Sequence, residues 1–147
     1  MKLHRIAATD AHAWTLAPVV FHRIERFCSA YPTEFDAHAM VNQVKMLFMA
    51  ESPLLGLWAA DDADGLVHGH MLAMYDPGRR IAFIYQQEVD KDVPTAIRDE
   101  CTDALVAWGT ACGARALEAV TWHNPRFLAR RGFHVYRTIV RRSLIDG

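Results

Sequence analysis

The chain has 147 residues, about the length of one domain. Hydrophobic residues make up 52% of it and charged residues 22%, proportions that exclude a disordered tail, a collagen-like repeat and a polar linker. With 16 basic and 17 acidic residues the net charge is -1, so the chain as a whole has no general attraction for nucleic acid or an anionic membrane. We therefore expect one domain spanning residues 1–147.

The cysteine content favours a reducing compartment. Cys28, Cys101 and Cys112 are few and odd in number, unlike the disulfide framework of a small secreted protein. The polar start of the chain and the absence of a run of about 18 apolar residues predict neither a signal peptide nor a membrane span. We expect a cytoplasmic protein, with Cys101 and Cys112 packed in a helix face about 16 Å apart, too far to form a disulfide.

The first third of the chain predicts a short strand followed by two helices. The strand covers Leu3 to Ala8, and apolar residues then recur at helical spacing after Pro18, which favours the first turn of a helix. Tyr31 and Pro32 end that helix. Thr33, followed by Asp36, resembles a capping box for a second amphipathic helix that ends near Ala50.

The middle of the chain predicts three strands, because its apolar and aromatic segments are too short for confident helices. The connections at 61–65 and 76–78 are rich in Asp, Gly and Pro, which favour tight turns and so an antiparallel meander. The predicted strands are Leu54 to Ala60, Leu66 to Tyr75 and Arg80 to Asp90.

The last third predicts a long helix that starts with a cap at Thr95 and ends at Gly113. A helical crossover makes the strands on either side of it parallel, so the predicted fold is a mixed α/β (α+β) domain, mostly antiparallel with one central parallel strand pair, flanked by helices. The predicted buried face of the long helix consists of Ile97, Cys101, Leu105, Trp108 and Cys112. The elements predicted after it are a strand at Ala116 to Trp122, a short helix from Asn124 to Gly132, and a strand at Val135 to Leu144.

This order of elements resembles the GNAT superfamily of N-acetyltransferases over nearly the whole chain. The most specific motif is Asn124 to Phe133, which is similar to the family's short last helix closing in Gly-Phe. The segments Leu57 to Ala60, Tyr75 to Arg80, Trp108-Gly109 and Arg131 to Phe133 more narrowly resemble small GNAT-like proteins of tailed bacteriophages.

The resemblance implies an acetyl-CoA cleft, but the chain departs from the family's pattern there. Relatives hold the pyrophosphate with a glycine-rich turn, Q/R-x-x-G-x-G/A, at the start of the long helix, where amides attract phosphate. Aligned on a strand that splays at Val89, this turn falls on Pro94 to Asp99, and Ile97 and Asp99 take the small-residue positions. We expect these side chains to crowd the amides, and Asp99 and Glu100 to place two carboxylates in the first helical turn.

We therefore expect no bound cofactor and only a vestigial acyl-CoA cleft near Val89, Thr95 and Ala96. Many relatives carry a tyrosine in the short last helix that protonates the leaving thiolate; the matching residue here is Leu128, which cannot donate a proton. No catalytic residue is expected; if the protein is active, Glu88 is the candidate general base.

Histidine spacing raises the possibility of a metal site. His68 and His70 lie two apart on a predicted strand and so share a face. Two ligands are too few, and a third, such as His22, His38 or His123, would have to come from elsewhere in the fold. We expect no metal.

Arginines crowd the end of the chain, after a stretch rich in acidic residues. The two stretches can partly neutralise each other, and arginine also suits protein interfaces. We expect protein partners, phage structural proteins or copies of the chain itself, to contact this surface; nucleic acid is an alternative that no aromatic ladder supports. The arginines are Arg126, Arg130, Arg131, Arg137, Arg141 and Arg142.

Three functions follow from these observations. The first is a non-catalytic GNAT-fold protein that acts as a virion or assembly component. The alternative is an acetyl-CoA-dependent N-acetyltransferase, and the third is a nucleic-acid-binding module. Host cytoplasm or a virion is the expected location, with no membrane association.

Overall fold

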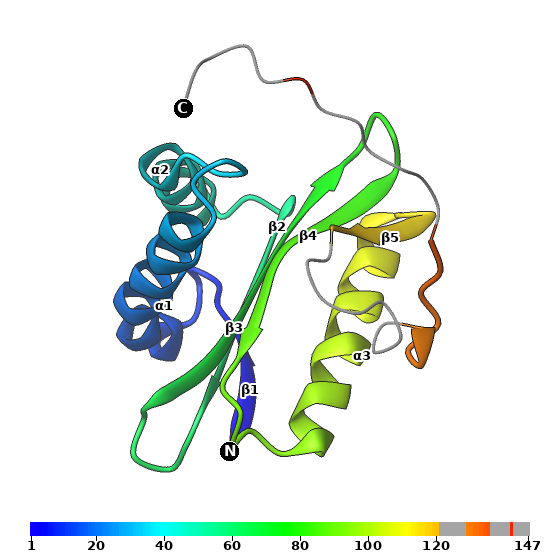
Figure 1. The fold of residues 1–147 in the computed structure, drawn as a ribbon. Helices are drawn as coiled ribbons and strands as arrows, with labels where there is room; N and C mark the ends of the chain where they lie inside the picture. Colours follow the sequence, from blue (N-terminus) through cyan, green and yellow to red (C-terminus); the bar gives the residue numbers. More distant parts are fainter. Residues whose placement is uncertain (121–128, 136–141, 143–147) are drawn as a thin grey trace.

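The computed structural model describes residues 1–120, 129–135 and 142 (Figure 1). Its sheet has the strand order β1-β2-β3-β4-β5. The first three neighbouring pairs are antiparallel and β4 pairs with β5 in parallel, which confirms the predicted mixed sheet. Along the chain the elements are β1 (Lys2–Arg5), α1 (Ala11–Ala30), α2 (Ala37–Met49), β2 (Leu55–Asp61), β3 (Val67–Asp76), β4 (Ile81–Val89), α3 (Thr95–Cys112) and β5 (Ala116–Ala119).

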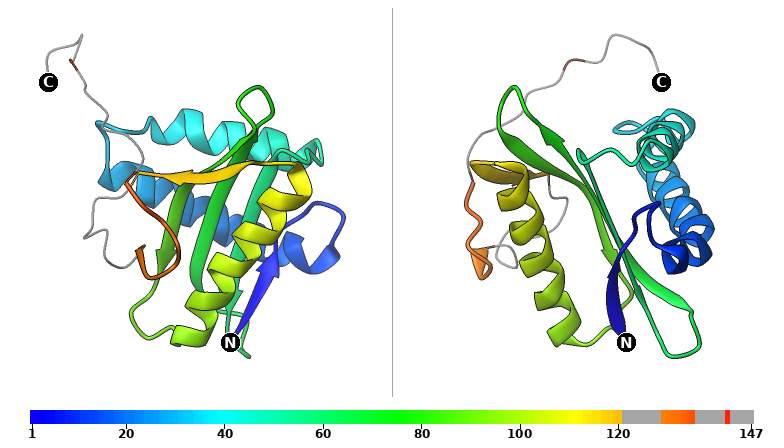
Figure 2. Two further views of the ribbon diagram at one scale, coloured as in Figure 1. Left: turned by 90° about the vertical axis from the view of Figure 1, so that its right-hand side faces the viewer. Right: turned by 180° about the vertical axis from the view of Figure 1, so that it is seen from behind.

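Helices cover both faces of the sheet. Figures 1 and 2 show α1 and α2 on one side and α3 alone on the other. Each side has its own core: residues such as Val20, Ile24 and Leu57 pack under α1 and α2, whereas Trp58, Leu105 and Trp108 pack under α3. Both faces of β2 are therefore buried, and its seven residues are all inaccessible to solvent.

The starts of the helices differ from the prediction. Helix α1 begins at Ala11, and Pro18 lies inside it, because the Asp10 side chain accepts a hydrogen bond from the His12 amide and caps the helix earlier. Helix α2 is capped by Asp36, whose carboxylate accepts from the Ala39 amide, so the predicted cap at Thr33 is wrong. Helix α3 begins at Thr95 and has Pro94 as its N-cap, so the predicted cap at Thr95 is wrong by one residue. Its end at Gly113, with φ 88°, is as predicted.

Strand β4 contains a bulge at Tyr85. Its register with β3 pairs Leu72 with Gln86 and Ala73 with Ile84, which leaves Tyr85 as the extra residue. The parallel ladder with β5 runs from Ile81 to Ile84. In the described residues the two strands thus part at the bulge, four residues before Val89, where the sequence predicted the splay.

The predictions for the end of the chain fall mostly outside the described residues. Ala129 is helical and Gly132 has φ 84°, which agrees with a helix ending at that glycine. Val135 and Arg142 are not in a strand, and the rest of the predicted strand, like Arg126, Leu128, Arg137 and Arg141, lies outside the described residues. No described helix combines the length and apolar character needed to cross a membrane.

Candidate functional site

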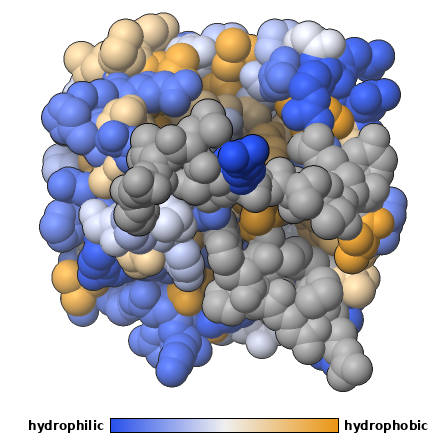
Figure 3. Space-filling view, turned by 45° about the horizontal axis from the view of Figure 1, so that its top comes forward, coloured by the Kyte–Doolittle hydropathy of each residue, from blue (hydrophilic) through white to orange (hydrophobic). Residues whose placement is uncertain are grey.

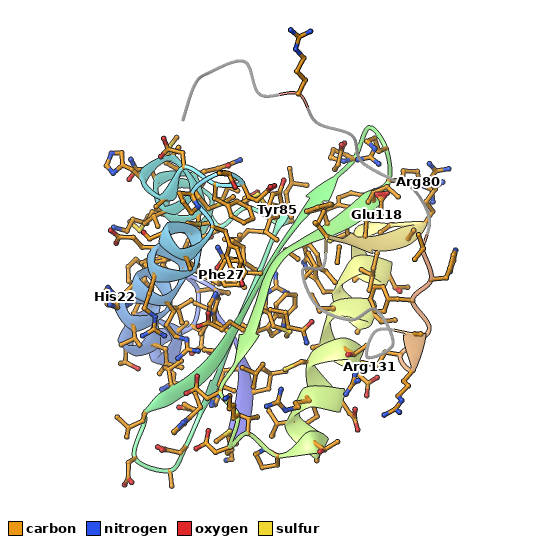
Figure 4. The ribbon with its side chains drawn as sticks, in the orientation of Figure 1. His22, Phe27, Arg80, Tyr85, Glu118 and Arg131 are labelled. Atoms are coloured by element: carbon orange, nitrogen blue, oxygen red, sulfur yellow. The ribbon has the colours of Figure 1, made fainter. Side chains whose placement is uncertain are left out.

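The second half of β4 offers an open strand edge. One edge of β4 pairs with β3 as far as Val89, but the other pairs with β5 only as far as Ile84. No strand among the described residues covers that second edge beyond the bulge. Tyr85 itself packs against the core under α1 and α2, on the same side of the sheet as Phe27 (Figure 4). Unpaired backbone N–H and C=O groups of a strand edge can bind an extended ligand.

The N-terminus of α3 follows the open edge after a short loop. The first amides of a helix have no carbonyl partner within it and carry a partial positive charge. No side chain caps α3, and Thr95 and Ala96 in its first turn are small and exposed. The arrangement can hold an anion at this helix end.

Two expected obstacles to anion binding are absent. The first turn of α3 contains no acidic residue, because the helix starts at Thr95 and Asp99 and Glu100 fall in the next turn. The Asp99 carboxylate is also paired, 3.1 Å from Nη2 of Arg131. Ile97 is only 7% exposed and packs in the core under α3, so its side chain does not crowd the amides.

Arg98 fixes the loop between β4 and α3, a role that the sequence analysis missed. Its Nη2 donates to the carbonyl of Asp90 at 2.7 Å, and its Nε donates to the carbonyl of Val93 at 3.2 Å. The side chain is half-buried. It thus ties the loop back to the helix and keeps a permanent positive charge close to the first turn.

Glu88 lies on the open half of β4 and is held by two arginines. Its Oε1 accepts from Nη2 of Arg23 at 3.1 Å and lies 3.5 Å from Nη2 of Arg26. Among the described residues its second oxygen, Oε2, has no partner, and the side chain is 34% exposed. Two arginines therefore hold Glu88 through Oε1, and Oε2 can accept a further hydrogen bond.

A buried polar chain supports Arg23 from within the sheet. Arg23 Nε donates to Nδ1 of His70 at 3.3 Å, His70 Nε2 lies 2.7 Å from Oε1 of Gln86, and Gln86 Nε2 donates to Sγ of Cys28 at 3.2 Å. Since Nδ1 of His70 accepts, its Nε2 carries the proton and donates to Gln86. Burial lowers the pKa of His70 to about 4, so the ring is neutral at pH 7.

The two histidines predicted to share a face bind different partners. His70 belongs to the buried chain, whereas Nε2 of His68 lies 2.7 Å from Oδ2 of Asp62, a hydrogen bond that raises the pKa of His68. Of the third ligands considered from the sequence, neither His22 nor His38 lies in a described cluster of ligand atoms with His68 or His70, and His38 bonds with Asn42. His123 lies outside the described residues.

The cysteines are free and packed. Burial raises the pKa of all three thiols, that of Cys101 to about 11, which disfavours a nucleophilic thiolate. Their position on α1 and α3 agrees with the predicted packing role for Cys101 and Cys112.

Among the predicted partner-binding arginines, Arg130, Arg131 and Arg142 lie in the described residues. Arg131 pairs with Asp99 of α3, beside which Figure 4 places it, so here the basic and acidic stretches do neutralise each other. Arg131 also lines a pocket of about 470 Å³ together with Leu117 and Phe133. Arg130 is exposed.

Comparison with solved structures identifies the fold of the chain. No protein-family model matches the sequence, and no curated protein is similar to it. Solved structures do match over nearly their full length, at 8% to 15% sequence identity. They show that the chain has the fold of the GNAT acetyltransferases.

Three of these structures are acetyltransferases. One, from an uncultured soil metagenomic sample, is an aminoglycoside acetyltransferase in complex with sisomicin; it has a TM-score of 0.63 and 14% identity, and the match covers 99% of this chain and 96% of that one. A second aminoglycoside acetyltransferase from such a sample has a TM-score of 0.62 and 15% identity, covering 99% and 98%. Glucosamine-6-phosphate N-acetyltransferase from Arabidopsis thaliana has a TM-score of 0.64 and 8% identity, covering 98% of both chains.

Proposed function

We propose that the protein is an N-acetyltransferase that transfers the acetyl group of acetyl-CoA to an amine. One observation carries this proposal: among the described residues, the edge of β4 that no strand covers is followed, after the loop at 90–94, by the N-terminus of α3, which no side chain caps. A strand edge can hold the extended amide-containing arm of the cofactor, and a helix N-terminus can hold its pyrophosphate. The two features lie in the order that such an elongated ligand requires.

The residues at this place fit the cofactor although the glycines of the family motif are missing. Thr95 and Ala96 would offer their amides to the pyrophosphate, and Arg98 would add a nearby positive charge. Ile97, which takes a glycine position, is buried under α3 and leaves the amides accessible. Acetyl-CoA would supply a thioester-activated acetyl group.

Glu88 is the candidate general base of the proposed reaction. It lies on the open half of β4, and Arg23 and Arg26 hold its Oε1 while Oε2 stays available. This oxygen can accept a proton from an ammonium or amine group of the acceptor. The candidate tyrosine position, Leu128, supplies no acid, so the departing thiolate must take its proton from water or from another group.

A test is the amine-dependent release of free CoA from acetyl-CoA, measured with a thiol reagent on a panel of amino sugars, aminoglycosides and polyamines. We expect turnover with at least one amine and a fall in kcat of about 100-fold in Glu88→Gln. Glu25→Gln removes an exposed carboxylate from α1 and is the matched control, with unchanged kcat. Equal activity of Glu88→Gln and the wild type would remove Glu88 from the mechanism.

The second candidate is a GNAT-fold protein without acyl transfer, and the double ion pairing of Glu88 favours it. The ion pairs with Arg23 and Arg26 give the Glu88 carboxylate a structural role that requires no catalysis. The three structures described above are acetyltransferases and give the phage and virion hypothesis no support. Absence of CoA release with every amine, together with absence of acetyl-CoA binding, would favour this candidate.

A further inference from the structure

A cluster of two histidines and one aspartate lies at the other end of the sheet from the β4–β5 pair. It consists of His4 on β1, His12 in the first turn of α1 and Asp61 at the end of β2. Each offers one ligand atom, and these atoms all lie within 4.8 Å of one another. Nε2 of His4 is 2.7 Å from Oδ1 of Asp61, and Nε2 of His12 is 3.7 Å from its Oδ2.

The fold brings these residues together from three elements. In the β1–β2 register His4 lies opposite Ala59, so Asp61 is its diagonal neighbour two residues along the same face. Helix α1 covers this face, and the cap at Asp10 fixes its first turn with His12 beside the His4 ring, at 4.9 Å between ring centroids. Three rigid elements therefore converge on the cluster.

Asp61 is a buried carboxylate without a permanent cation against it. Its side chain is only 7% exposed, and a buried carboxylate requires a compensating positive charge. Lys2 lies opposite Asp61 in the strand register, yet no described lysine or arginine forms an ion pair with Asp61. Its ion-pair partners in the described part of the chain are the two histidines, which compensate the charge only when protonated.

We propose that His4, His12 and Asp61 form a binding site for a divalent transition-metal ion of the zinc type. Two imidazole nitrogens and one carboxylate oxygen are ligands that zinc prefers, and three protein ligands with an open fourth position are usual for exposed or reactive zinc. His12 is 49% exposed, so solvent reaches that fourth position. The inference concerns a site apart from β4 and α3 and does not depend on the proposed transferase activity.

The geometry needs only small adjustments to hold the ion. Tetrahedral zinc with bonds near 2.1 Å keeps its ligand atoms about 3.4 Å apart. The distances from the two histidines to the Asp61 carboxylate, 2.7 Å from His4 Nε2 to Oδ1 and 3.7 Å from His12 Nε2 to Oδ2, lie on either side of this separation. Exposed His12 can rotate to make its adjustment without disturbing the core.

The second cluster with ligand atoms is a poorer candidate. It combines His68 with Asp90 and Asp92, whose side chains are 41% and 72% exposed. Asp90 already forms an ion pair with Arg23, and His68 already pairs with Asp62. These carboxylates have solvent and cationic partners, so they have no need of a metal ion.

The test is calorimetric titration of Zn²⁺ into untagged, chelator-treated protein, with Co²⁺ absorption as a second readout. We expect one Zn²⁺ per chain with micromolar or tighter affinity, and visible Co²⁺ bands of a four- or five-coordinate site. Asp61→Asn and His12→Gln should each weaken Zn²⁺ binding by about 100-fold. His38→Gln and Asp92→Asn, at sites outside the cluster, are the controls and should bind Zn²⁺ like the wild type.

If Asp61→Asn fails to fold, His12→Gln still tests the proposal, because His12 is exposed and its replacement leaves the core intact. Binding of Zn²⁺ by His12→Gln with wild-type affinity would overturn the proposal. Loss of binding in Asp92→Asn alone would place the ion at the second cluster and equally contradict it. Wild-type affinity no tighter than millimolar would also overturn the proposal.

Discussion

At the scale of single residues, the buried polar chain makes stability depend on pH. His70 is 1% exposed, and burial lowers its pKa from 6.5 to about 4. Between these pH values the unfolded chain binds a proton that the folded chain does not, so stability rises with pH in this window. The neutral ring therefore contributes stability above pH 6.5 that is lost progressively as the pH falls toward 4.

We predict that the free energy of unfolding of the wild type falls by about 3 kcal/mol from this group between pH 6.5 and 4. His70→Gln should be less stable at pH 7 but should lose this part of the acid dependence. His68 remains in both proteins and shifts in the opposite direction, so the difference between their urea-unfolding profiles isolates His70. Parallel profiles for the two proteins would show that His70 is not held neutral.

The sequence could not reveal this chain of contacts. Arg23 lies among apolar residues of α1, between Val20 and Ile24, and a buried arginine requires polar partners. Its partners, His70 and Glu88, are 47 and 65 residues away. Helical spacing signals which residues face the core, but it carries no information on which distant side chain meets Arg23.

At the scale of elements, β2 and α3 meet through two tryptophan rings that pack edge to face, with centroids 5.7 Å apart. The Trp58 ring covers Gly56 of the same strand, and a Cβ at Gly56 would lie 2.7 Å from one of its ring atoms and 3.0 Å from the Trp108 ring. Both tryptophans are buried, so neither ring has room to move. The glycine is required by close packing and not by its backbone angles.

Gly56→Ala should therefore destabilise the protein by about 1 to 3 kcal/mol through overpacking. Urea unfolding followed by tryptophan fluorescence measures this, since the rings themselves report the change. Gly78→Ala, in the exposed β3–β4 turn, is the control and should change stability by less than about 0.5 kcal/mol. Similar stabilities of Gly56→Ala and the control would contradict the packing argument.

The order and type of the elements up to β5 followed from local patterns, whereas the starts of the helices did not. The buried face of α3 and the antiparallel meander were predicted correctly because periodicity and turn residues determine them. The start of α1 was wrong because Asp10 and Pro18 are both acceptable helix starts, and tertiary packing of residues such as Ala13 and Leu16 selects the earlier one. The bulge at Tyr85 has no local sequence signal.

At the scale of the whole molecule, some apolar side chains remain on the described surface. Trp14 on α1 and Met46 and Met49 on α2 are 46%, 72% and 64% exposed. On the face in Figure 3, hydrophobic residues are interspersed with hydrophilic ones. The predicted docking of a partner on the arginine-rich end stays a prediction, and the pairing of Arg131 with Asp99 uses one of those arginines within the chain.

The central claim is that acetyl-CoA binds along β4 and at the N-terminus of α3. Isothermal titration calorimetry of acetyl-CoA against Thr95→Glu tests it most directly, because a carboxylate there repels pyrophosphate but favours the helix dipole. We predict micromolar binding by the wild type and affinity weakened by at least about tenfold in Thr95→Glu, with an unchanged or higher Tm. Ala107→Glu adds the same charge at an exposed site farther along α3 and should bind like the wild type. Wild-type binding no tighter than about 1 mM, or equal affinities for wild type and Thr95→Glu, would contradict the account.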